Sequence, residues 1–205
     1  MSGDPGSGKT IFCLQYLFNG ATQFNEKGVY ISLEETVEEI TNTAAVFGWD
    51  FKKLMEDKKV ELQTIELYDF DKLRDAIEDA VSRLDASRVV IDPGVVFRLY
   101  FERELDARKR ILGLGKMLKS INATTIITNE LTLGQSRQDG GLYGLEEYVA
   151  DGVILLYHTK VGVNFVRNIA MLKMRNTKIS EQLFPVTIDS NGIKVEHNKA
   201  LHEQI

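Results

Sequence analysis

The sequence has few of the features that mark secreted or membrane-spanning proteins. Its 205 residues include a single cysteine, Cys13, so no disulfide can form within the chain, and the apolar neighbours of Cys13 are typical of a small buried side chain. No apolar run approaches the roughly 18 residues needed to cross a bilayer, and the amino terminus lacks the basic-then-apolar pattern of a signal peptide. These absences predict a cytoplasmic protein.

Positive charge is also scarce. The net charge of −5 and the pI near 5.3 mean that the average surface repels nucleic acid and anionic membranes. The basic residues between Arg103 and Lys119 alternate with leucine and isoleucine at helical spacing, which favours a solvated helix face. We therefore expect no membrane partner, and a nucleic-acid partner is possible but not favoured. The histidines lack metal-ligand spacing, and we interpret them as structural or solvated: His158, His197 and His202.

The apolar pattern switches repeatedly between strand-length runs and amphipathic stretches of helical length. This alternation predicts an α/β fold in which helices cover a mostly parallel central sheet. The expected strands are residues 28–33, 60–67, 88–92, 124–128 and 152–157, and the expected helices are residues 9–24, 36–47, 70–84 and 104–121.

Beyond Tyr157 the pattern changes to strands joined by turns. Residues 165–175 and 183–196 are predicted strands, and Asp-Ser-Asn-Gly at 189–192 is a strong turn signal, so antiparallel hairpins should end the chain. Residues 132–144 contain four glycines and are predicted to form a long loop. Because no linker or internal repeat is visible, we expect residues 1–205 to form one domain.

A phosphate-binding loop is the strongest motif in the chain. Glycines let successive backbone N–H groups turn toward a phosphate, the lysine reaches the terminal phosphates, and the threonine hydroxyl can bind Mg²⁺. A glycine-rich turn that only caps a helix would need neither the lysine nor the hydroxyl. The predicted ATP-binding residues are Gly3, Asp4, Pro5, Gly6, Ser7, Gly8, Lys9 and Thr10.

The segment before this loop is unusually short. A P-loop normally connects a strand to a helix, yet only Met1 and Ser2 precede Gly3. We therefore expect the strand before the P-loop to be missing and the loop to bind nucleotide weakly. Either the chain is shortened at its amino terminus relative to related domains, or a different segment supports the loop.

Carboxylates end two of the predicted strands. Asp92 follows an apolar run and could hold Mg²⁺ together with Thr10, although an aspartate before Pro-Gly can also simply start a turn. Glu34 and Glu35 end another strand, where one of them could polarise the water that attacks ATP. Glu35 could instead belong to the start of the following helix.

These motifs, in this order and spacing, resemble a KaiC-like ATPase domain of the RecA type. The resemblance extends to Phe-Gly-Trp-Asp at 47–50, Thr-Thr-Ile-Ile-Thr-Asn-Glu at 124–130, residues 143–153 and Leu-Lys-Met-Arg-Asn-Thr at 172–177. The similarity is greatest to the single-domain archaeal and bacterial type. It implies a RecA-type fold, ATP and Mg²⁺ as ligands, slow hydrolysis, and a homo-oligomeric ring that commonly has six subunits.

The resemblance also implies catalytic roles. Glu34 and Glu35 would act on the attacking water, and Lys173 and Arg175 would reach the γ-phosphate held by the adjacent subunit. The residues alone would instead place Lys173 and Arg175 on an ordinary exposed strand. The chain departs from the family pattern in having Pro93, Asn176 and Ile179 where serine, glycine and histidine are usual.

Three functions remain open at the level of sequence. The first is an oligomeric ATPase that couples its nucleotide state to partner binding. The second is a recombinase-like motor that touches DNA through residues 132–144, in which Arg137 is the one cation. The third is a nucleotide-gated scaffold that binds ATP without useful turnover.

Overall fold

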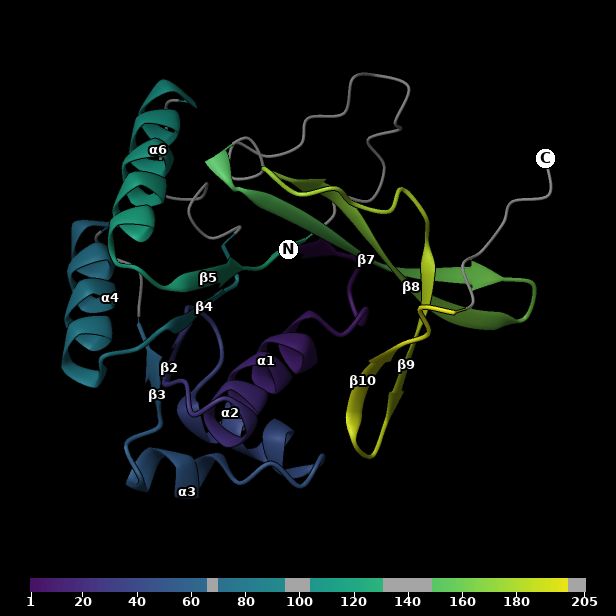
Figure 1. Cartoon of the computed structure of the whole chain (residues 1–205), viewed down its shortest axis with the longest axis horizontal. Helices are drawn as coiled ribbons and strands as arrows, with labels where there is room; N and C mark the ends of the chain where they lie inside the picture. Colours follow the sequence, from purple (N-terminus) through teal and green to yellow (C-terminus); the bar gives the residue numbers. More distant parts are fainter. Residues whose placement is uncertain (66–69, 95–103, 131–148, 199–205) are drawn as a thin grey trace.

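The computed structural model describes residues 1–65, 70–94, 104–130 and 149–198 (Figure 1). Its strands form two hydrogen-bonded sheets that adjoin at Thr128, and we refer to the two together as the central sheet. Four parallel strands form one part of the sheet in the order β3-β2-β4-β5, and six strands form the other in the order β10-β9-β8-β7-β1-β6. Thr128 alone separates β5 (Thr124–Ile127) from β6 (Asn129–Glu130). The two parts therefore continue into each other along one stretch of chain.

The parallel part is buried on both faces. Strands β2 (Gly28–Ser32) and β4 (Arg88–Asp92) lie side by side at its centre, and β3 (Val60–Thr64) pairs with the other edge of β2. All five residues of β2 are buried, as expected for a strand covered by helices on both sides. In this register Ser32 pairs with Asp92, so the carboxyl ends of both strands lie together. We call the side of the sheet where the parallel strands end its carboxyl edge.

Helices cover the two faces of this part in separate groups (Figure 1). On one face, Val29, Ile31 and Ile91 pack against α4 (Phe70–Leu84) and α6 (Glu104–Ser120). The alternate side chains Tyr30 and Val90 pack on the other face against three helices: α1 (Lys9–Gln23), α2 (Val37–Ala45) and α3 (Phe51–Glu56). The period-2 alternation of β2 and β4 thus determines which core each side chain enters.

The antiparallel end of the sheet matches the predicted hairpins. Strand β7 (Gly152–Val161) pairs with β8 (Asn164–Met174), and β8 pairs with β9 (Phe184–Asp189). Strand β10 (Gly192–Val195) closes the last hairpin through the predicted turn, where Gly192 has a φ of 110° that favours glycine. This hairpin returns beside α1 (Figure 1).

The strand before the P-loop is reduced to two residues rather than absent. Strand β1 (Ser2–Gly3) pairs in parallel with β6 on one side and with β7 on the other. The amino group of Met1 donates a 2.6 Å hydrogen bond to the carbonyl of Ile127, which extends this pairing by one residue.

Next to β1, a cavity of about 720 Å³ lies among α1, α6, β5 and β7.

The fold class predicted from the sequence is confirmed, and the differences are local. Helix α3 was not predicted, because its six residues are too few to show a helical period, although Asp50 caps it through a 2.9 Å bond from the Lys53 N–H. In the described part of the chain, no helix is both long and apolar enough to span a membrane. The predicted loop at 132–144 and its Arg137 lie outside the described residues.

Candidate functional site

The P-loop lies at the carboxyl edge of the sheet, between β1 and α1. Gly6 and Gly8 have φ values of 71° and 102°, which L side chains rarely adopt. The Lys9 ammonium donates to the carbonyls of Gly3 and Asp4 at 2.9 and 3.1 Å, so its charge lies across the loop. The predicted residues therefore form a compact backbone cradle that fixes the position of the Lys9 ammonium group. This geometry is suited to binding a polyphosphate.

Residues of β7 and β8 hold the P-loop in place. The Asp4 N–H donates to the carbonyl of Leu156 at 3.1 Å, and the Asp4 carboxylate accepts the His158 N–H at 2.8 Å. From β8, the Arg167 guanidinium donates to the carbonyl of Gly6 at 3.0 Å. These contacts give the loop support from the antiparallel part of the sheet, in addition to the short β1.

Asp92 lies beneath the loop at the end of β4 and is the centre of a network of hydroxyl groups. Its Oδ2 accepts hydrogen bonds from Thr10 at 3.0 Å and from the Tyr30 hydroxyl at 2.5 Å, and its Oδ1 accepts one from Thr128. Burial and the nearby Asp92 charge raise the pKa of Tyr30 well above its usual value, so Tyr30 is a neutral donor. Asp92 is only 9% exposed, and its charge is stabilised by these three donors.

The donor set around Asp92 fits a magnesium ion. The predicted ligands Thr10 and Asp92 are in direct contact, and Mg²⁺ prefers hydroxyl and carboxylate oxygens together with phosphate and water. Among the described residues, no group of three or more His, Cys, Asp or Glu side chains could hold a metal ion. A cation here would thus depend on phosphate oxygens for much of its coordination, as is usual in P-loop sites.

Glu34 and Glu35 lie in the exposed turn between β2 and α2. The alternative in which Glu35 starts the helix is wrong, because Thr36 is the N-cap and forms a capping box with Glu39. The backbone carbonyl of Glu35 accepts hydrogen bonds from the hydroxyls of Ser32 at 2.6 Å and Thr64 at 3.0 Å, which fixes the turn. Partial burial, followed by the charge of Asp92, raises the pKa of Glu35 and makes it a stronger base.

Lys173 and Arg175 lie on the opposite side of the sheet, where the parallel strands begin, which we call its amino edge. Strand β8 places Met174 opposite Gly152, whereas Leu156 is the residue of β7 that contacts the P-loop. The four residue steps from Gly152 to Leu156 correspond to about 13 Å of strand. Within one chain, the structure therefore does not bring Lys173 and Arg175 to the P-loop.

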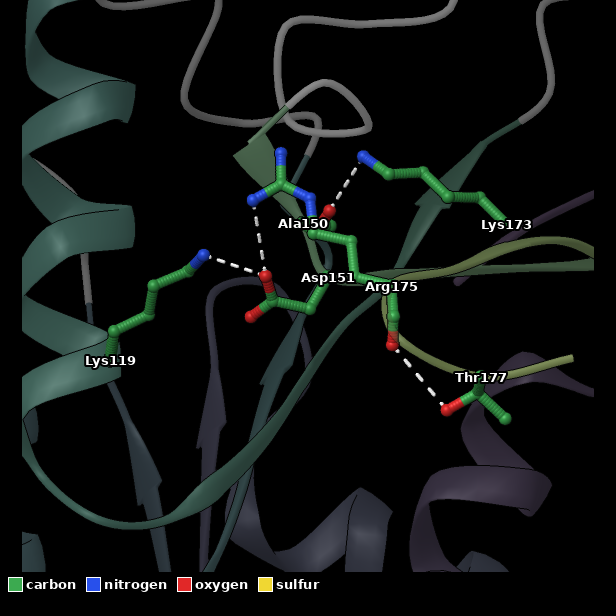
Figure 2. Close-up of polar contacts among 6 residues, drawn as sticks. All are labelled: Lys119, Ala150, Asp151, Lys173, Arg175 and Thr177. Atoms are coloured by element: carbon green, nitrogen blue, oxygen red, sulfur yellow. Dashed lines mark hydrogen bonds and ion pairs between the residues drawn. The ribbon is translucent and has the colours of Figure 1, made fainter.

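The two cations instead belong to a cluster around Asp151, at the amino end of β7 (Figure 2). Asp151 accepts from Lys119 at 2.7 Å and from Arg175 at 3.3 Å, while Lys173 donates to the carbonyl of Ala150 at 2.8 Å. Hydrogen bonding to Lys119 lowers the pKa of Asp151. Desolvation, followed by the charge of Arg175, lowers the pKa of Lys173.

Asn176 adopts a backbone conformation that glycine usually provides. Its φ is 57°, in the left-handed region, and asparagine is one of the few other residues that enter this region readily. The replacement of the family's usual glycine by Asn176 is therefore compatible with the backbone shape that follows Arg175.

Four residues near the P-loop were missed by sequence reasoning. Tyr30 and Thr128 bind Asp92, and His158 and Arg167 bind the loop. Thr128 directly follows β5, and Asp92 is the last residue of β4. Its position at the end of a predicted strand could therefore have marked Thr128 as a candidate site residue. The others had no such signal, because their roles depend on pairings between distant strands. His158 was expected to be structural or solvated, and its contacts to the loop and its ring packed against Phe165 fit the structural alternative.

Comparisons with known proteins agree with this geometry. A family model described as "ATPase: KaiC" matches residues 1–200. The circadian clock oscillator protein KaiC of Synechococcus elongatus is 32% identical over 207 residues, which cover 95% of this chain and 39% of that protein. KaiC of Prochlorococcus marinus subsp. pastoris is 33% identical over 208 residues, covering 95% of this chain and 40% of that protein. The chain thus spans about two fifths of the length of these curated relatives.

A solved structure gives the same result for the fold. The crystal structure of a KaiC-like protein from the hyperthermophilic archaeon Pyrococcus horikoshii OT3 has a TM-score of 0.84 and 34% sequence identity, covering 95% of this chain and 86% of that one. Because the family model matches residues 1–200, which include the P-loop and all of the described strands, this chain belongs to the KaiC family of RecA-type P-loop ATPases.

Proposed function

We propose that this protein binds Mg·ATP, hydrolyses it slowly as a homo-oligomeric ring, and uses its nucleotide state to control the binding of a partner protein. The observation that carries this proposal is the 3.0 Å hydrogen bond between Thr10 and Asp92 beneath the P-loop. A glycine-rich turn that only capped a helix would not need a buried carboxylate placed against its threonine.

Each part of the carboxyl edge has a role in this proposal. The backbone of residues 3–8 and the Lys9 ammonium bind the phosphates, and Thr10 and Asp92 hold the metal ion. When bound, Mg²⁺ neutralises charge on the phosphate oxygens. Glu35 accepts the proton of the attacking water, and its raised pKa suits that role.

The opposite edge of the sheet supports the oligomeric part of the proposal. Lys173 and Arg175 are about 13 Å or more from the loop along β7, so they can act on a phosphate only across a subunit interface. A cation supplied by a neighbour would stabilise charge on the transferring phosphoryl group after the ring has formed. Hydrolysis would then depend on assembly.

Calorimetry and phosphate release together test the proposal. The wild-type protein should release heat on titration with Mg·ATP and liberate phosphate slowly, whereas Asp92→Asn should bind with lower affinity because the anionic metal ligand is lost. In EDTA, where no Mg²⁺ is available, the ATP affinity of Asp92→Asn should differ much less from that of the wild type. No heat with Mg·ATP in the wild type would refute the proposal.

The nucleotide-gated scaffold is the second candidate, and Pro93 favours it. Pro93 has neither a hydroxyl nor an N–H group to offer at the position after Asp92. A single-turnover assay separates the two functions, since a scaffold would retain bound ATP without releasing phosphate. Salt-dependent DNA binding would favour the recombinase-like alternative instead.

A further inference from the structure

Three hydroxyl groups fix the orientation of the Asp92 carboxylate. Thr10 comes from α1, Tyr30 from β2, and Thr128 from the segment between β5 and β6. Because the donors belong to different elements and occupy both oxygens of Asp92, the carboxylate cannot rotate without breaking at least one hydrogen bond. The network therefore restricts Asp92 more strongly than Thr10 could alone.

Tyr30 donates from within the hydrophobic core. Its side chain is 1% exposed and packs in the core with Leu14, Leu17 and Val90. Parallel pairing places Tyr30 opposite Val90 and Ser32 opposite Asp92. The Tyr30 side chain therefore extends toward the carboxyl edge to reach Asp92, which lies two residues beyond its direct partner Val90. At 2.5 Å, its bond to Asp92 is short enough for a hydroxyl donating to a charged oxygen.

The direction of the hydrogen bonds matters for the metal site. The single proton of the Thr10 hydroxyl is donated to Asp92, which leaves the oxygen lone pairs of Thr10 available to a cation. The orientation of Thr10 therefore depends on the position of Asp92, and the position of Asp92 depends on Tyr30 and Thr128.

We propose that Tyr30 is a positioning residue for the magnesium site, which acts through Asp92 to aim the Thr10 hydroxyl at the cation. The inference rests on the proposed binding of Mg·ATP. In this role Tyr30 would act through its hydrogen bond to Asp92, without itself binding the nucleotide or the metal ion. Its hydroxyl has the role that outer partners of metal ligands commonly have, and loss of such a partner lowers metal affinity by about tenfold or more.

The test compares ATP affinity in magnesium with ATP affinity in EDTA, for the full chain and its Tyr30→Phe variant. Phenylalanine keeps the buried ring and removes only the hydroxyl. The ratio of the two affinities should fall about tenfold in Tyr30→Phe, while the affinity in EDTA stays near that of the wild type. Tyr16→Phe is the matched control, because the Tyr16 hydroxyl donates to the carbonyl of Thr124, away from Asp92, at 3.1 Å. The control should leave the ratio unchanged.

A double-mutant cycle with Asp92→Asn shows whether Tyr30 acts through Asp92. In the Asp92→Asn background, Tyr30→Phe should produce little further change in the ratio. Site-specific 3-fluorotyrosine at position 30 retains the hydroxyl and should preserve the wild-type ratio.

Several results would overturn the inference. Equal losses in magnesium and EDTA would show that Tyr30 only stabilises the fold, and so would a loss in the fluorotyrosine protein equal to that in Tyr30→Phe. An additive effect in the Asp92→Asn background would exclude action through Asp92. A wild-type protein whose ATP affinity does not depend on magnesium would instead refute the proposed function itself.

Discussion

The two edges of the central sheet both carry charged residues, but they hold these residues in different ways. At the carboxyl edge, Asp92 is 9% exposed and has three hydroxyl donors, and Lys9 lies against backbone carbonyls. At the amino edge, the side chains of Asp151, Lys119 and Arg175 are 55%, 45% and 48% exposed. The first arrangement is fixed by the fold, whereas the second consists of solvent-screened ion pairs.

This difference bears on which contacts can change during function. An exposed ion pair contributes only about 0 to 1 kcal/mol, so Arg175 can leave Asp151 at little energetic cost when another anion approaches. Asp92 cannot lose its partners so easily, because each lost hydrogen bond would leave a buried charge less satisfied. We infer that the carboxyl edge is preformed within the chain, and that the ion pairs of the amino edge could exchange at the subunit interface of the proposed ring.

The largest expected effect is on hydrolysis. Glu35→Gln removes the base and should lower the rate of phosphate release by about a thousandfold with little loss of ATP affinity. Glu34→Gln is the matched control and should lower the rate less than about tenfold, because the proposal assigns the proton transfer to Glu35. Quenched-flow measurement of phosphate release provides the comparison. Equal losses in both variants would contradict the assignment to Glu35.

The same assignment predicts a pH dependence. Because the pKa of Glu35 is raised above 4.5, the acid limb of the rate profile should lie at a higher pH than for an ordinary glutamate. The base must be ionised to accept a proton, so the rate should fall as the pH decreases through this raised pKa. The residual activity of Glu35→Gln should lack this limb.

Binding by the P-loop is the next largest effect. Lys9→Ala should lower ATP affinity by about a hundredfold, because charge-assisted hydrogen bonds to phosphate are lost. The exposed Lys53 of α3, which pairs with the C-cap residue Asp57, provides the control, and Lys53→Ala should bind ATP as the wild type does. Calorimetry measures both variants. Unchanged affinity in Lys9→Ala would mean that the loop does not bind the phosphates.

Much of the carboxyl edge could be predicted from the sequence, because its signals are local. The P-loop is contiguous, and Asp92, Glu34 and Glu35 each follow a recognisable apolar run, so their positions at strand ends were predicted from the pattern. The contacts of Tyr30 and Arg167 were not predictable, since they depend on which strands pair and in which register. Tyr30 in particular reads as an ordinary core residue until β2 is placed beside β4.

The amino edge was predictable only through family resemblance. Nothing local to Lys173 or Arg175 indicates a role, and in the structure Arg175 pairs with Asp151, which lies 24 residues earlier in the chain. The short β1 was also difficult to foresee. Two residues are too few to show a strand pattern, and β1 exists because β6 and β7 offer hydrogen bonds on both of its sides.

A mixing experiment tests whether the two edges complement each other between subunits. Lys9→Ala lacks the phosphate-binding lysine but keeps Arg175, and Arg175→Ala has the opposite defect. Each protein alone should hydrolyse ATP at least about tenfold more slowly than the wild type. Random co-assembly should recover about one quarter of wild-type activity, because that fraction of head-to-tail interfaces joins two intact halves. No recovery in verified mixed assemblies would show that the Arg175 acting on ATP is not supplied in trans.

The smallest expected effect is on stability at the amino edge. Lys119→Ala removes the 2.7 Å ion pair with Asp151 and should lower the free energy of unfolding by about 0.2 to 1 kcal/mol, because both side chains are exposed. For a domain of this size, that corresponds to a decrease in Tm of about 0.4 to 4 °C at neutral pH. Lys119 lowers the pKa of Asp151, so this stabilisation is present above pH 3.8 and is lost as the pH falls through the lowered pKa. Added salt should also reduce the difference in stability between the wild type and Lys119→Ala, as measured by thermal unfolding. A salt-independent loss of several kcal/mol would show instead that the Asp151 cluster is a fixed part of the fold, and the contrast between the two edges would disappear.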